Sequence, residues 1–86
     1  MPEISRFYGI VIRMFYDDHN PPHFHAQYGE QEAVVEIASL AVIAGYLSPR
    51  ARGLVVEWAV LHQDELRVNW TRAEARERPA RIEPLR

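Results

Sequence analysis

The chain has 86 residues, 48% of them hydrophobic and 26% charged, which is the composition of a folded domain and predicts a single domain over residues 1–86. Its formal net charge of −2 argues against a general nucleic-acid binder, because such proteins usually carry an excess of basic residues. The absence of cysteine excludes disulfide bonds, thiolate nucleophiles and zinc sites built on cysteine.

Three strands are predicted in the first half of the chain. Residues 8–16, YGIVIRMFY, put one apolar row on one face and are rich in the β-branched and aromatic side chains that strands prefer. The following DDHNPP breaks this pattern, since neither proline can donate a hydrogen bond to a neighbouring strand. Alternation resumes over residues 23–28 and again over residues 32–38, which predicts a second and a third strand.

The next segment leads into the helical half of the chain. Residues 40–46, LAVIAGY, are compatible with a fourth strand or a short helix, and a strand is favoured because Gly45 and the next helix start follow so closely. That helix is predicted to begin with Ser48 as its N-cap and Pro49 as its first residue. Its apolar pattern slips at residues 63–65, which predicts a kink or a second helix.

These elements together predict an α+β fold: a three- or four-stranded antiparallel meander followed by a helical hairpin packed on one face. The terminal IEPL is expected to fold back as a small apolar tail. No apolar run approaches the roughly 20 residues that cross a bilayer, and no signal-peptide pattern is present. We therefore expect no membrane association and a cytoplasmic location.

The stretch DDHNPPHFHA, which begins at Asp17, contains three of the four histidines. In an extended strand His23 and His25 point the same way, with Cα atoms about 6 to 7 Å apart, so the two imidazoles can share one ion. His19 could fold over them across the double proline, and Asp17 or Asp18 could add an oxygen ligand. A divalent ion such as Zn²⁺, Ni²⁺ or Fe²⁺, held by the three histidines, is one open interpretation. The other open interpretation is that the protein binds no cofactor.

The same stretch also suits acid–base chemistry. His23 and His25 could act as base and acid in phosphodiester transesterification, because an imidazole exchanges a proton near neutral pH. The ribose hydroxyl would be the nucleophile, and Arg13 on the preceding strand could bind the phosphate through two hydrogen bonds. A purely structural interpretation remains open beside it, in which the prolines set the approach to the strand and the histidines bond carbonyl groups or form a polar docking face.

The segments DHNPPHFHAQYG, EWAVLHQDELRVNW and the terminal IEPL together resemble the small bacterial family called Domain of Unknown Function 4160. The resemblance covers nearly the whole chain. The matching positions are His19, Asn20, Pro21, Pro22, His23, Phe24, His25 and Ala26 in the first half, and Trp58, His62, Leu66, Asn69 and Trp70 in the helical half. The chain departs from the family pattern at ASLAVIAGYL, which lacks a glycine-containing turn at that place.

The resemblance implies a short cytoplasmic bacterial protein that is often encoded beside a second small protein, one with a proposed DNA-binding segment. That pairing is similar to a toxin–antitoxin or regulator module, and no established activity comes with it. Because His62 belongs to the matching positions, it becomes a further candidate. It could approach His23 and His25 in a composite pocket if the helices pack over the sheet edge.

Two functions of different classes follow as expectations. The first is a protein-binding component of a two-gene toxin–antitoxin-like or regulatory module, whose partner is the small protein encoded alongside; a homo-oligomer is also open. The alternative is a small metal-independent ribonuclease-like toxin that acts on RNA. In that alternative His23 and His25 are catalytic, Arg13 binds phosphate and His62 is an additional candidate.

Overall fold

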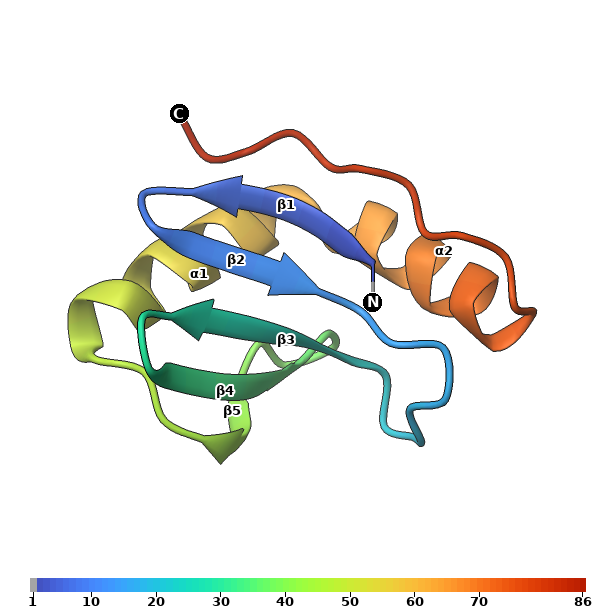
Figure 1. The fold of residues 1–86 in the computed structure, drawn as a ribbon, viewed down its shortest axis with the longest axis horizontal. Helices are drawn as coiled ribbons and strands as arrows, with labels where there is room; N and C mark the ends of the chain where they lie inside the picture. Colours follow the sequence, from blue (N-terminus) through green and yellow to red (C-terminus); the bar gives the residue numbers. More distant parts are fainter. Residues whose placement is uncertain (1) are drawn as a thin grey trace.

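A computed structural model describes residues 2–86, and in it five strands precede two helices (Figure 1). The elements in chain order are β1 (Glu3–Phe7), β2 (Ile10–Arg13), β3 (His23–Tyr28), β4 (Gln31–Glu36), β5 (Val42–Gly45), α1 (Pro49–Leu61) and α2 (Gln63–Glu74). The sheet order is β1-β2-β3-β4-β5, and each strand pairs antiparallel with the next. The predicted α+β class and meander are confirmed, with five strands in place of three or four.

The additional strand is β1 at the start of the chain, and the strand predicted over residues 8–16 is confirmed only over Ile10–Arg13 as β2. Tyr8 and Gly9 have φ angles of 48° and 81° and form a two-residue turn between β1 and β2. Positive φ at both positions is the backbone of the tight hairpin turn that suits a twisted sheet. Asparagine or aspartate is the usual first residue of this turn. Tyr8 is instead a residue that strands prefer, so the sequence pattern did not indicate a turn at this position.

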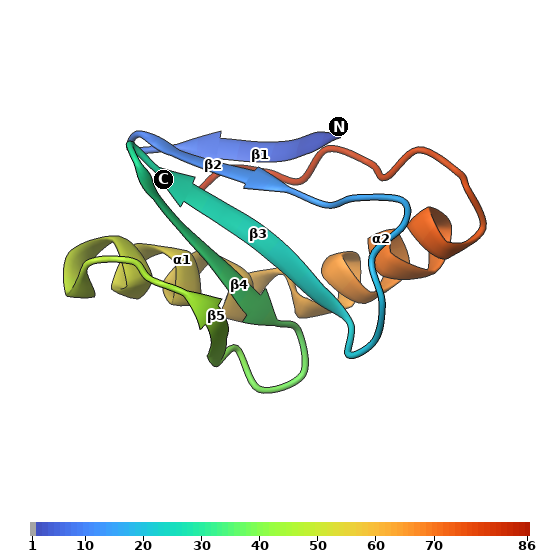
Figure 2. The ribbon, with the colours of Figure 1, turned by 60° about the horizontal axis from the view of Figure 1, so that its bottom comes forward.

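Both helices lie on one face of the sheet, and the hydrophobic core fills the space between (Figures 1 and 2). Trp58 of α1 is fully buried, and its ring centroid lies 5.4 Å from that of Phe7 and 5.8 Å from that of Phe24. Since side chains alternate along a strand, Phe24 and Ala26 point toward the helices while His25 and Gln27 lie on the opposite face. This alternation brings part of the histidine motif to the uncovered side of the sheet.

The start of the helical half agrees with the sequence pattern. The Ser48 hydroxyl accepts a 3.3 Å hydrogen bond from the main-chain N–H of Ala51, and Pro49 is the first helical residue. The helices meet at His62, and Figure 2 shows α2 continuing past the end of the sheet, so the two lie end to end along it. Within residues 2–86, neither helix is both long enough and apolar enough to cross a membrane.

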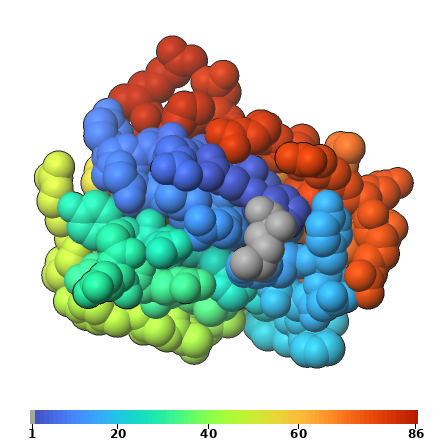
Figure 3. Space-filling model, in the orientation of Figure 1, coloured from blue at the N-terminus to red at the C-terminus, as the bar shows by residue number. Residues whose placement is uncertain are grey.

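The two edges of the sheet differ in how they are covered. The C-terminal tail folds back along β1 (Figure 3). The N–H of Ile82 donates a 2.7 Å hydrogen bond there to the carbonyl oxygen of Ile4. Ile82 is 4% exposed, which confirms the apolar tail expected from IEPL. At the other edge is β5, which confirms the strand favoured for residues 40–46 and pairs only with β4 among residues 2–86.

Candidate functional site

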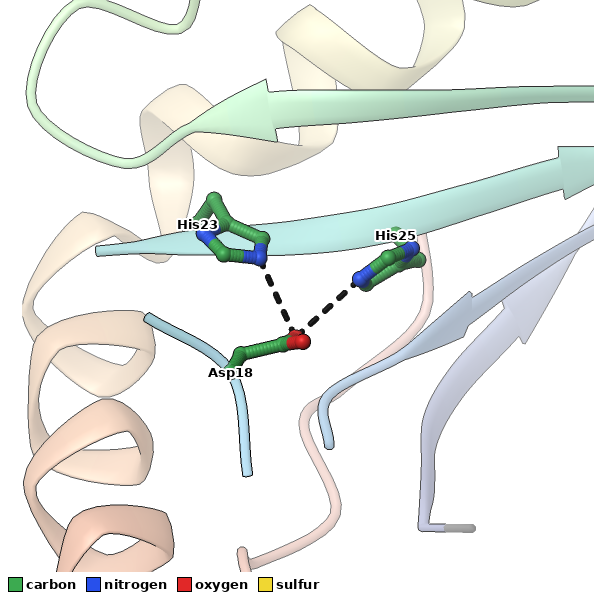
Figure 4. Close-up of side chains that lie close together, drawn as sticks. All are labelled: Asp18, His23 and His25. Atoms are coloured by element: carbon green, nitrogen blue, oxygen red, sulfur yellow. Dashed lines mark hydrogen bonds and ion pairs between the residues drawn. The ribbon is translucent and has the colours of Figure 1, made fainter. Parts of the chain in front are cut away.

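The histidine motif forms a three-residue cluster with an aspartate where the loop after β2 meets the start of β3 (Figure 4). His23 and His25 come from β3, and Asp18 comes from the loop. One carboxylate oxygen, Oδ2 of Asp18, lies 3.1 Å from Nε2 of His23 and 3.1 Å from Nε2 of His25. The three atoms all lie within 4.8 Å of one another, so the cluster has the dimensions of a small ligand set.

His23 is held in place by its second ring nitrogen. Its Nδ1 lies 2.7 Å from the carbonyl oxygen of Pro21, and a carbonyl can only accept, so Nδ1 carries a hydrogen and donates it. The ring packs against Trp70 with a centroid distance of 5.1 Å and is 8% exposed. These contacts set the tautomer as well as the ring orientation and direct Nε2 toward Asp18.

His25 is placed by contacts on both sides of its ring. Phe15 packs edge to face against it, with ring centroids 4.5 Å apart. Its Nδ1 is buried and has no hydrogen-bond partner within residues 2–86, although Oε2 of Glu32 lies 3.4 Å away. A buried ring nitrogen without a hydrogen bond is costly, and the carboxylate of Glu32 already lies within ion-pair distance of it.

Two carboxylates lie close to the histidine rings of the cluster. With both imidazoles neutral, the carboxylates of Asp18 and Glu32 supply two negative charges within 3.1 to 3.4 Å of the rings. Because Nδ1 of His23 is protonated, its neutral form presents a lone pair to the carboxylate of Asp18, and two acceptors then face each other. A proton on Nε2 or a cation between the two groups removes this repulsion.

The structure brings together only part of the predicted metal set. His23 and His25 project together as expected, but His19 is exposed and lies outside the cluster found among residues 2–86. Asp18 takes its place, as one of the two carboxylates expected to add an oxygen ligand. Sequence spacing alone could not separate His19 from Asp18, because a loop has no periodicity that predicts which side chain turns inward.

The predicted phosphate-binding residue, Arg13, lies beside the cluster. It is the direct cross-strand partner of His25 in the pairing of β2 with β3. Its guanidinium donates a hydrogen bond to the side-chain oxygen of Gln27, which lies on the same face of the sheet. Arg13 and His25 therefore share the uncovered face, through a strand pairing that the sequence alone did not establish.

His62, the fourth candidate, is engaged elsewhere. Its Nδ1 pairs with the carboxylate of Glu65, and its ring lies 5.6 Å from that of Trp58 between centroids. It borders surface grooves with Leu61 and the C-terminal tail and is not part of the cluster formed by Asp18, His23 and His25 in the described chain. Among residues 2–86, the cluster therefore contains no contribution from His62, which the sequence had placed in a composite pocket with it.

A comparison with protein-family models matches residues 9–71 to the family described as Domain of unknown function (DUF4160). The chain belongs to this family. The match includes Asp18, His23 and His25 and ends within α2, so the whole cluster of this DUF4160 protein lies inside the family region. No curated protein and no solved structure matches the chain.

Proposed function

We propose that this DUF4160 protein is a protein-binding component of a two-gene regulatory or toxin–antitoxin-like module, and that it binds its partner along the outer edge of β5. The observation that carries the proposal is the difference between the two sheet edges. The tail covers β1, whereas β5 has a strand partner on one side only within residues 2–86. An uncovered edge presents main-chain N–H and C=O groups that can pair with another strand.

The side chains near β5 favour contact with an apolar partner. Residues 39–49 contain no charged side chain. Ile43 is 46% exposed and Tyr46 is 61% exposed. Sheet edges that avoid association usually carry lysine, another charge or proline, and β5 itself has none of them. An extended apolar segment of the partner is the occupant that this edge suits best.

The geometry of β5 also limits the size of that segment. The strand has four residues, and its register with β4 shifts between Val34 and Val35. Such an irregular strand supports only a short added ladder, because a bulge interrupts regular pairing. Contacts with Ile43 and Tyr46 must therefore supply much of the affinity, which makes the interaction sensitive to single substitutions.

The test uses the chain and the small protein encoded by the adjacent gene, co-expressed and purified together. We expect Ile43→Lys to abolish the complex, because it places a charge on the apolar edge. Val60→Lys is the matched control: Val60 is 58% exposed but belongs to α1 rather than to the β5 edge, and this variant should retain the partner. The proposal fails if Ile43→Lys binds as well as the parent, or if Val60→Lys loses equal affinity.

The molecular mass in solution of the chain, purified without its partner, distinguishes self-association from partner binding. We expect a monomer, which gains mass only when the partner protein is added. If the isolated chain is a dimer that Ile43→Lys dissociates, the β5 edge binds a second copy and the proposed occupant is wrong.

The ribonuclease alternative is favoured by one observation, the register that puts Arg13 directly opposite His25. In that reading Arg13 holds the phosphate while His23 and His25 exchange protons, without a metal. Induction of the chain should then arrest growth and degrade RNA, and His25→Ala should relieve both effects. Unchanged growth and intact RNA after induction would exclude this alternative.

A further inference from the structure

We propose that Asp18, His23 and His25 bind a divalent first-row transition-metal ion through Oδ2 and the two Nε2 atoms. The proposal is independent of the docking edge, because the cluster is built from the 14–22 loop and β3 rather than from β5. It differs from the set predicted from sequence by replacing His19 with Asp18.

The distances suit one shared ion. Two ligand atoms bound at about 2.0 to 2.2 Å lie roughly 3 Å apart when they occupy neighbouring coordination positions. Asp18 Oδ2 is 3.1 Å from the Nε2 atom of each histidine, and all three atoms fall within 4.8 Å of one another. Small side-chain adjustments, about 1 Å or less, place a single ion in contact with all three atoms.

The tautomer of His23 supports a metal ligand. Its Nδ1–H donates to the carbonyl oxygen of Pro21, which leaves the Nε2 lone pair directed at Asp18. Metal-binding histidines commonly donate their second N–H to a carbonyl or carboxylate, and this bond orients the ring before the ion arrives. The main chain at Pro21 provides this support for His23.

The unpartnered nitrogen of His25 provides the second observation. Its Nδ1 is buried without a hydrogen bond in the described chain, and Oε2 of Glu32 on β4 lies 3.4 Å away. If Nδ1 of His25 carries the ring hydrogen and donates it to Glu32, the buried Nδ1 gains a hydrogen-bond partner. Nε2 of His25 then has a free lone pair with which to bind a metal ion. In this arrangement a carboxylate accepts a hydrogen bond from the histidine that binds the metal, as is common around bound ions.

Charge and donor type limit the class of ion. Two imidazole nitrogens and a carboxylate oxygen suit zinc, iron, cobalt or nickel better than calcium or magnesium, which prefer oxygen ligands alone. A dication balances the charges of Asp18 and Glu32. Three protein ligands leave at least one coordination position for water, and the Asp18 side chain, 24% exposed, borders the solvent through which an ion would enter.

The decisive experiment measures binding of Zn²⁺, and separately of Co²⁺, to untagged protein stripped with a chelator. Isothermal titration should show one ion per chain. Asp18→Ala should weaken binding by more than about 10-fold because a ligand is lost, and Glu32→Gln should weaken it by about 10-fold because the support of His25 is lost. His19→Ala is the matched control, a neighbouring histidine outside the cluster, and should bind like the parent.

A measurement on the unaltered protein guards against variants that do not fold. In ¹⁵N spectra of the histidine rings, Zn²⁺ should shift Nε2 of His23 and His25 and leave the rings of His19 and His62 unchanged. The proposal is overturned if the unaltered protein binds no ion, if His19→Ala removes binding, or if folded Asp18→Ala binds with unchanged affinity.

Discussion

The indole N–H of Trp58 donates a 2.8 Å hydrogen bond to the main-chain carbonyl oxygen of Glu83, 25 residues further along the chain. The bond joins the centre of the core to the C-terminal tail. Because the tail also pairs with β1 through Ile82 and Ile4, Trp58 helps to hold the cover over that sheet edge. The covered β1 edge is thus linked to Trp58, whose side chain also packs in the core between the sheet and the helices.

Replacing Trp58 with phenylalanine should lower the free energy of unfolding by about 2 kcal/mol, because buried volume and a hydrogen bond are lost together. Urea unfolding followed by far-ultraviolet circular dichroism measures the change. Trp70→Phe is the control: Trp70 is 5% exposed and packs against His23, and its indole N–H makes no hydrogen bond to the tail within residues 2–86. An equal or greater loss in the control would contradict the role given to the Trp58–Glu83 bond.

Asn69 should hold the tail through a pair of hydrogen bonds. Its side chain is 1% exposed, donates to the carbonyl oxygen of Ala80 and accepts from the N–H of Ala80, both at 2.9 Å. Asn69→Leu should cost about 1 to 3 kcal/mol, because main-chain groups lose their partners. Limited trypsin digestion should show faster cleavage after Arg81, because Arg78 is followed by Pro79 and is not a trypsin site. Unchanged cleavage would mean that the tail is held by other contacts.

Two glycine substitutions should change stability in opposite directions. Gly45 has a φ of 75°, and an added Cβ would overlap the main-chain oxygen of Glu32. Gly45→Ala should therefore cost about 2 kcal/mol or more. Gly53 lies inside α1 with nothing within 4 Å of an added Cβ, so Gly53→Ala should stabilise by about 0.5 to 1 kcal/mol. Thermal unfolding of both variants measures the contrast, and shifts of the same sign would contradict it.

The acid stability of the protein should depend on Glu3. Hydrogen bonds from Arg6 and then Arg81 lower the pKa of Glu3 from 4.5 to about 2. A lowered pKa means that the ion pairs stabilise the fold fully above pH 4.5, and this contribution is lost as the pH falls toward 2. The pairs are solvent-exposed, so the contribution should be below about 1 kcal/mol and smaller in high salt.

The comparison that tests this dependence is the parent against Glu3→Gln, unfolded with urea at a series of pH values. The difference in unfolding free energy should be largest above pH 4.5 and should shrink as the pH approaches 2. A difference that stays constant over this range would show that Glu3 acts through packing rather than through its charge.

Local patterns predicted the elements whose signals are contained within a few residues. The alternation of residues 23–28 predicted β3 with the bounds that the structure shows, because Phe24 and Ala26 are buried while His25 and Gln27 on the other face are less so. Ser48 and Pro49 predicted the start of α1, because capping depends only on neighbouring residues. The turn at Tyr8 and Gly9 was missed, because tyrosine rarely adopts the left-handed conformation that Tyr8 has there, with a φ of 48°.

By itself the sequence determined the α+β class, the projection of His23 and His25 from one strand and the family to which the chain belongs. Only the tertiary structure decided that Asp18 rather than His19 completes the cluster, that His62 lies elsewhere, and that the tail seals one sheet edge and not the other. The reason is physical: periodicity reports which way a side chain points within its own strand or helix. The path of a loop and the meeting of distant segments depend on packing across the whole chain.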